Sequence, residues 1–135
     1  MVGLTRFAPM TGGLYLGWAL GANDAANVFG TAVGTHVIGF RRAAFFCGVM
    51  VILGAVLQGG EGIETLSGIT GQTVRTAVVV SVAAALTGTL MTWRRIPIST
   101  SQAVVGAILG IGLATRDTDF AELGKVVLCW VGTPF

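Results

Sequence analysis

The sequence predicts an all-α protein that crosses a membrane several times. Of its 135 residues, 53% are apolar and only 10% are charged, whereas a soluble domain carries charges at about 25% of its positions. The charged residues stand in a few short patches between long apolar runs, which is the pattern of transmembrane helices joined by loops. The formal net charge of +2 is too small to indicate nucleic acid as a partner. We therefore expect a multi-pass protein of the inner or plasma membrane, in contact with lipid.

The first apolar run extends from Phe7 to Phe40, and Asp24 is its only charged residue. As a single helix it would be about 51 Å long at 1.5 Å per residue, although the hydrocarbon core of a bilayer is about 30 Å thick. The Gly and Asn residues at positions 21, 23 and 27 are where interrupting a helix costs least. We therefore predict a broken helix, or a half-helix that enters the membrane and turns, near Gly21.

Two further spans are predicted between residues 43 and 93. The apolar run Ala43–Gln58 indicates the second span, and a polar loop is expected from Gly59 to Arg75. The run Val74–Trp93 indicates a third span of about the 20 residues that a bilayer requires. Its last residue is a tryptophan, which is typical of the membrane interface.

Two arginine pairs set the expected orientation of these spans. Arg41-Arg42 and Arg94-Arg95 are separated by two spans, so both pairs lie on one side, which the positive-inside rule makes the cytoplasm. The segment Ile96–Thr115 either crosses the membrane or forms a re-entrant hairpin, and a last apolar segment begins at Val126. If Ile96–Thr115 crosses, the number of crossings is odd, and a following copy of the unit would be inverted, as in many transporters. Residues 1–135 would then be a single transmembrane repeat unit.

A first polar cluster interrupts the first apolar run at Asn23, Asp24 and Asn27. An ionised carboxylate in the middle of a bilayer costs about 2.5–3.5 kcal/mol even on the lenient insertion scale. Asp24 should therefore face protein, a water-filled cavity or a cation, and a cation or proton is the simplest partner. Asn23 and Asn27 lie four residues apart, one helical turn, and offer amide oxygens to a cation and amide N–H groups to an anion.

A second cluster, which we call the hydroxyl cluster, covers Pro97–Gln102. Pro97 cannot continue a preceding helix, and Ser99, Thr100 or Ser101 is a suitable N-cap for the apolar run that follows. The first turn of that helix has unpaired main-chain N–H groups, which with three hydroxyls and the side chain of Gln102 suit an oxyanion. One cluster would hold a cation and the other an anion, which is a recurring arrangement in transporters.

Simpler interpretations of these residues remain open. An Asn-Asp pair can cap a helix break, and Ser/Thr clusters can join helices by hydrogen bonds. The glycine pairs Gly17/Gly21, Gly30/Gly34 and Gly106/Gly110 are typical of helix-packing faces. The sequence has no Ser-His-Asp arrangement with supporting context, no Cys/His metal spacing and one carboxylate within the apolar runs. These observations predict that the chain is not an enzyme.

Both clusters stand in stretches that resemble the PiT family of inorganic phosphate transporters. GLYLGWALGANDAANVFGTAVGTHVI, which begins at Gly13, resembles the N-terminal signature of that family. RIPISTSQAVVGAILGIG, which begins at Arg95, resembles the Pro-Ser-Thr motif of the same repeat. The resemblance implies a symporter that couples inorganic phosphate to sodium or protons. It also implies two inverted copies of this unit around a central site, with no cofactor besides the coupling ion.

The resemblance also implies roles for residues that match the family's motifs. Asp24 and Asn27 match the residues implied to hold the coupling cation and the substrate, with Asn23 beside them. If the cation is sodium, Asp24 is its expected ligand. The positions implied to bind the substrate anion in the hydroxyl cluster are Ser99, Thr100 and Ser101, followed by Gln102.

The chain departs from the family pattern at Ser101-Gln102, where members often have Thr-His, so a sulfate permease of the same family is an alternative. The intact Asn-Asp pair favours phosphate, because phosphate at neutral pH can donate a hydrogen bond to a carboxylate and sulfate cannot. That distinction holds only if Asp24 touches the anion.

Length is the larger departure, because the chain carries one copy of a unit that the family carries twice. We expect it to be the N-terminal half of a longer transporter, although pairing with a second copy of the chain as an antiparallel dimer would also complete the site. A membrane assembly subunit that transports nothing is the alternative from a different functional class.

Overall fold

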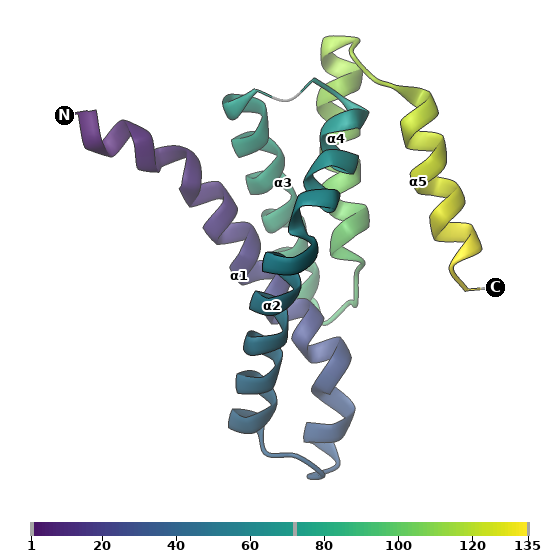
Figure 1. Cartoon of the computed structure of the whole chain (residues 1–135). Coiled ribbons are helices and arrows are strands. Elements are labelled where there is room, and N and C mark those ends of the chain that lie inside the picture. The colour runs from purple at the N-terminus through teal and green to yellow at the C-terminus, as the bar shows by residue number, and fades with distance from the viewer. Residues whose placement is uncertain (1, 72, 135) are drawn as a thin grey trace.

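The computed structural model describes residues 2–71 and 73–134, and within them the side chains from residue 10 onward except those at 61 and 62. Over these residues the chain forms five α-helices and no strand, which confirms the all-α prediction (Figure 1). In chain order the helices are α1 (Val2–Gly34), α2 (Phe40–Ile69), α3 (Val74–Trp93), α4 (Thr100–Thr115) and α5 (Phe120–Gly132).

Two helices begin where the sequence places them. α3 has the bounds of the predicted third span, and a capping box starts it, because the Thr73 and Thr76 side chains accept hydrogen bonds from each other's main-chain N–H groups. α4 begins after Ser99, one of the three hydroxyl residues predicted as its N-cap. With 16 residues, α4 is about 24 Å long, which is shorter than the hydrocarbon core of a bilayer.

The predicted break in the first apolar run is wrong. α1 is a continuous helix that passes through Gly21 and Asn27. The polar side chains that were expected to interrupt it bond instead to a distant segment, since the amide of Asn23 donates to the carbonyl oxygen of Ile98. The helix can therefore keep its own main-chain hydrogen bonds. Figure 1 shows α1 running obliquely across the other helices, which is one way to fit a long helix into a membrane.

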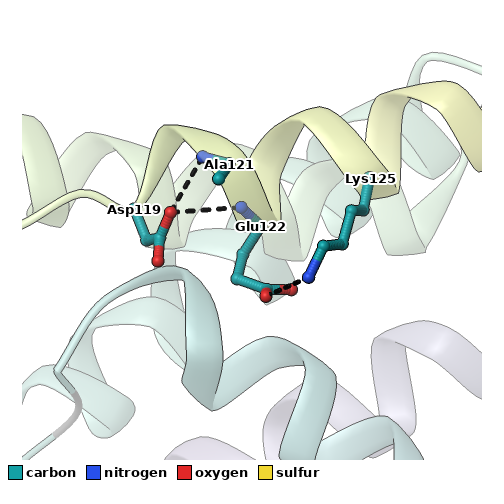
Figure 2. A network of polar contacts seen from close by, with 4 residues as sticks. All are labelled: Asp119, Ala121, Glu122 and Lys125. Atoms are coloured by element: carbon teal, nitrogen blue, oxygen red, sulfur yellow. Dashed lines mark hydrogen bonds and ion pairs between the residues drawn. The ribbon is translucent and has the colours of Figure 1, made fainter.

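The predicted loop from Gly59 to Arg75 is also wrong over most of its length, because α2 continues to Ile69. The last segment likewise starts earlier than Val126, since α5 begins at Phe120. Its N-cap is Asp119, whose carboxylate accepts the main-chain N–H groups of Ala121 and Glu122 at 2.8 and 3.2 Å (Figure 2). One turn later the ammonium group of Lys125 pairs with the carboxylate of Glu122. The polar residues that precede Val126 therefore form the first turns of a capped helix.

The end of α2 is held by the connection between α4 and α5. The main-chain N–H of Asp119 donates to the carbonyl of Ile69 at 2.9 Å, and the N–H of Gly71 donates to Asp117 Oδ2 at 3.1 Å. Ile69 is completely buried and forms the core cluster with three other apolar side chains, Val80, Val105 and Ile108. These contacts join α2, α3 and α4 at the end of the molecule opposite the start of α4.

Small residues allow α1 and α3 to pack closely. A Cβ atom at Gly12 would lie 3.3 Å from the carbonyl oxygen of Val78, and Gly88 faces the methyl group of Ala19. Ala84 and Ala85 of α3 are almost completely buried. Between the two helices the hydroxyl groups of Tyr15 and Thr89 form a hydrogen bond of 3.0 Å. Close packing and an interhelical hydrogen bond are the interactions that hold helices together in lipid.

Large apolar side chains cover much of the surface, as in Leu14 and Leu57, which are 74% and 78% exposed. Within the described residues, Phe40–Gly60 and Val74–Trp93 are long and apolar enough to cross a membrane. A surface of this kind is suited to lipid or to other transmembrane helices.

The predicted packing faces at the glycine pairs are not used within the described residues. A Cβ atom at Gly17, Gly21, Gly30, Gly34, Gly106 or Gly110 would meet nothing within 4 Å. The glycine that does permit a close contact on α4 is Gly112, where a Cβ atom would collide with the hydroxyl oxygens of Thr70 and Thr118.

We predict that Gly112→Ala destabilises the purified chain in detergent by about 1–3 kcal/mol, because the added methyl group forces the two threonine hydroxyls and the loops that carry them apart. Gly110→Ala is the matched control on the same helix, and we expect it to be neutral or to stabilise by up to about 1 kcal/mol through helix propensity. Thermal unfolding followed by circular dichroism measures both. Equal melting temperatures for the two variants would contradict the contact.

Candidate functional site

The structure brings the asparagine-aspartate and hydroxyl clusters into direct contact, although about 75 residues separate them in the sequence. The hydroxyl of Thr100 donates to the carboxylate of Asp24, with distances of 3.0 Å to Oδ2 and 3.2 Å to Oδ1. The amide nitrogen of Asn23 donates to the carbonyl oxygen of Ile98 at 2.9 Å and to Asp24 Oδ1 at 3.1 Å. The middle of α1 and the start of α4 therefore form one polar site.

Burial divides these residues into two kinds. Asn23 and Thr100 are buried, with 5% and 7% of their surfaces exposed. Asp24 is exposed, although its carboxylate accepts hydrogen bonds from both of them. The buried pair thus holds the carboxylate in place from one side, and its other side remains open.

The donors around Asp24 are neutral, so they orient the carboxylate without cancelling its charge. Among the described residues the ion pair is that of Lys125 with Glu122, on a different helix, and no basic side chain pairs with Asp24. A carboxylate that is positioned but not neutralised can bind a cation or take up a proton.

The start of α4 supplies the groups expected for an anion. Ser99 caps the helix, because its hydroxyl oxygen accepts the main-chain N–H of Gln102 at 3.4 Å. The earlier N–H groups of the first turn have no partner within an α-helix, and the positive end of the helix dipole lies there. Ser101 and Gln102 are exposed beside them. This end of α4 therefore offers main-chain and side-chain donors next to the carboxylate of Asp24.

The six residues predicted to bind substrate occupy different positions in this arrangement. Asn23 and Thr100 lie in the contact and use their donors on Ile98 and Asp24, and Ser99 serves as the helix cap. The remaining three, Asn27, Ser101 and Gln102, are exposed. Asn27 lies three residues after Asp24 on α1, so the two side chains share a face of the helix.

The sequence did not indicate that the carbonyl of Ile98 takes part. Ile98 stands between Pro97 and Ser99 in the non-helical connection from α3 to α4. Residues outside a helix have carbonyl groups that must find partners elsewhere, and the position after a proline in a short connection could have suggested this one. Tyr15 was also missed, and it holds α1 against α3 through Thr89 two helical turns before Asn23.

Helices long enough to cross a membrane, and a polar site built from a helix start and a carboxylate, are features that helical membrane transporters share. Residues 20–135 match the model of the phosphate transporter family. The chain belongs to that family. The predicted family resemblance is therefore confirmed.

The chain is similar to several relatives over nearly its whole length. Two of them bear the name "Putative phosphate permease": the protein from Methanocaldococcus jannaschii is 33% identical over 97% of this chain, and that from Chlamydia trachomatis is 34% identical over 93%. "Inorganic phosphate transporter 2-1, chloroplastic" from Arabidopsis thaliana is 31% identical over 97% of the chain. No solved structure matches the chain.

The chain spans only part of these relatives. It covers 43% of the Methanocaldococcus protein, 32% of the Chlamydia protein and 24% of the Arabidopsis protein. The relatives therefore contain further sequence beyond the region that this chain matches.

We predict that Asn23→Leu destabilises the purified chain in detergent by about 1–3 kcal/mol, because it removes the donor to Ile98 and leaves that carbonyl without a partner. Asn27→Leu, one turn away and exposed, should change the free energy of unfolding by less than about 0.5 kcal/mol. Thermal unfolding of both variants tests this. The contact between α1 and the α3–α4 connection would be refuted if Asn23→Leu were as stable as Asn27→Leu.

Proposed function

We propose that the full protein carrying this chain transports inorganic phosphate across the cell membrane in symport with sodium or protons. The observation that supports this most directly is the hydrogen bond from Thr100 to Asp24, which joins a carboxylate to the start of a helix. Family membership supports phosphate as the substrate. The geometry of the site supports a physical reason why the transport of phosphate would be coupled to that of a cation.

The reason is electrostatic. Phosphate is an anion, and two unit charges of the same sign 4 Å apart repel by about 4 kcal/mol at an effective dielectric constant of 20. An anion next to ionised Asp24 is therefore unfavourable until a cation or proton neutralises the carboxylate. Since binding of each ion favours binding of the other, the site occupied by both ions is favoured over the site occupied by one, as symport requires.

Thr100 can link the two binding events. Its hydroxyl has a single hydrogen, and in this structure the hydrogen is directed to Asp24. When a cation or proton occupies Asp24, the carboxylate becomes a weaker acceptor, and the hydroxyl can rotate to donate to an oxyanion. The exposed donors Ser101 and Gln102 and the first turn of α4 would bind the remaining phosphate oxygens.

The oxygen atoms of this site suit sodium as well as a proton. The carboxylate of Asp24 and the amide oxygens of Asn23 and Asn27 are hard ligands of the kind that sodium and other hard cations prefer. Among the described residues no group of three or more His, Cys, Asp or Glu side chains gathers to hold a metal ion. A weakly held monovalent ion that travels with the substrate therefore fits the site better than a resident transition metal.

We further propose that the open side of the site is closed by another part of the assembly. Asp24, Asn27, Ser101 and Gln102 are exposed here, and the chain matches less than half of each of these relatives. A second, inverted repeat in the same protein is the partner that we favour, and a second copy of the chain would serve the same purpose. Relative movement of the two halves would expose the site to one side of the membrane at a time.

Asp24→Asn in the full protein should reduce cation-coupled phosphate uptake at least about tenfold, because a neutral amide cannot attract the coupling ion. Glu64→Gln is the control, since it removes an exposed carboxylate at the far end of α2, and uptake should stay within about twofold of the wild type. Uptake of labelled phosphate into cells or proteoliposomes, with and without a sodium or proton gradient, measures both. Normal coupled uptake by Asp24→Asn would exclude the role proposed for this residue.

The same assay separates the two alternatives. Unlabelled sulfate in excess should leave labelled phosphate uptake unchanged, whereas strong competition would favour the sulfate permease. A non-transporting assembly subunit predicts no uptake by the wild type and no change in its thermal stability when phosphate is added.

A further inference from the structure

The two arginine pairs, which the sequence presents as equivalent topology signals, have different positions in the fold. Arg41-Arg42 lies in the first turn of α2, directly after the connection from α1. Arg94-Arg95 follows the end of α3, where the N–H groups of Arg94, Arg95 and Ile96 bond back to carbonyls of α3. Arg95 has a φ of 59°, in the left-handed region, which is uncommon for a residue other than glycine. The second pair is therefore held in a tight turn against the end of α3.

Contacts between α1 and α3 give the level of this turn along α1. A groove is lined by Trp18, Ala19 and Ala22 of α1 and by Thr89, Thr92 and Trp93 of α3, so the end of α3 lies beside Ala22. Four residues after the turn begins, Ile98 bonds to Asn23. Ala22 lies twelve residues before the end of α1 at Gly34, which is about 18 Å along the helix at 1.5 Å per residue.

Arg94-Arg95 therefore lies much deeper than Arg41-Arg42. Figure 1 shows the connection between α3 and α4 beside the middle of α1, whereas the connection between α1 and α2 lies at one end of the molecule. The offset of about 18 Å is measured along α1, so the oblique course of this helix makes the difference in depth smaller than that, against a hydrocarbon thickness of about 30 Å. If Arg41-Arg42 marks the membrane surface, Arg94-Arg95 lies at the depth of the polar site.

No described side chain neutralises the charges at this depth. Both Arg94 and Arg95 are exposed, and within the described part of the chain neither forms an ion pair. An unpaired arginine at mid-membrane costs about 2.5–3.5 kcal/mol even on the lenient insertion scale, unless it faces water or an anion. Arg95 also lies close to the polar site, because the main chain from Arg95 to Thr100 spans at most about 18 Å even when fully extended.

We propose that Arg94 and Arg95 line a water-filled vestibule, open to the side of Arg41-Arg42, and attract phosphate to the site at Asp24 and Thr100. This proposal rests on the proposed function. Two arginines in a recess raise the local concentration of an anion, and their guanidinium groups match phosphate oxygens in geometry.

The kinetic test compares the two pairs in the full protein. The double variant Arg94→Gln/Arg95→Gln should raise the KM for phosphate about fivefold or more, with the maximal rate within about twofold, because attraction is lost and the binding site is intact. The KM should also lose most of its dependence on ionic strength, and Arg94→Lys/Arg95→Lys should retain most of the wild-type behaviour. Arg41→Gln/Arg42→Gln, the matched control, should leave the KM unchanged. An unchanged KM in the first variant, or an equal rise in the control, would overturn the proposal.

A second test does not depend on transport. Arg95→Cys and Arg42→Cys are each made in the full protein after all its native cysteines, including Cys47 and Cys129, have been replaced by serine. Both variants are treated with a membrane-impermeant anionic thiol reagent. We expect both to react from the same side of the membrane, and inorganic phosphate should slow the reaction at position 95 alone. No reaction at position 95, or reaction from the opposite side, would refute the vestibule. If phosphate slows the reaction at position 95 but the protein takes up no phosphate, the proposed transport is refuted and the proposal of an anion-attracting vestibule still stands.

Discussion

The hydrogen bonds that join Asp24 and Asn23 of α1 to Thr100 and Ile98 determine how the rest of the site is arranged. A carboxylate among apolar residues is costly if it enters a membrane, and these bonds reduce the cost by bringing neutral donors to it. They also fix the start of α4 against the middle of α1. These donors are neutral, so they add no positive charge beside the carboxylate, and under the proposed function a cation or proton supplies it when an anion binds.

Local features of the sequence account for several parts of the fold. The bounds of α3 follow from an apolar run of the right length, and the start of α4 follows from a proline and a capping serine. Two polar clusters in apolar surroundings pointed to the candidate site, because polar groups in a membrane must find partners. The grouping of Asp24 with Thr100 could thus be anticipated, although not the donor and acceptor of each bond.

Contacts between distant segments account for what the sequence did not reveal. Whether α1 breaks depends on whether Asn23 finds an acceptor outside its own helix, and that acceptor is Ile98. Whether α2 ends at its glycines depends on Ile69, which is buried in the core and bonded to Asp119. The depth of Arg94-Arg95 depends on the length of α3 relative to α1. Each of these three features depends on residues far away in the sequence, so the local sequence could not predict it.

The site combines residues that fix the geometry with residues that are free to contact ions. Asn23, Ser99 and Thr100 use their polar groups within the chain, so their substitution should alter the position of the carboxylate and the helix start. Asn27, Ser101 and Gln102 are exposed. Under the proposed function, this division would let one repeat present a preorganised half of a site that a second repeat completes.

The central claim is that Asp24 and Thr100 act as one unit, and a double-mutant cycle tests it most directly. Phosphate uptake is measured for the wild type, Asp24→Asn, Thr100→Val and the double variant in the full protein. The account predicts strong non-additivity, with a coupling energy of about 0.5–3 kcal/mol, because either single change already breaks the link. Additive effects of the two substitutions would contradict it.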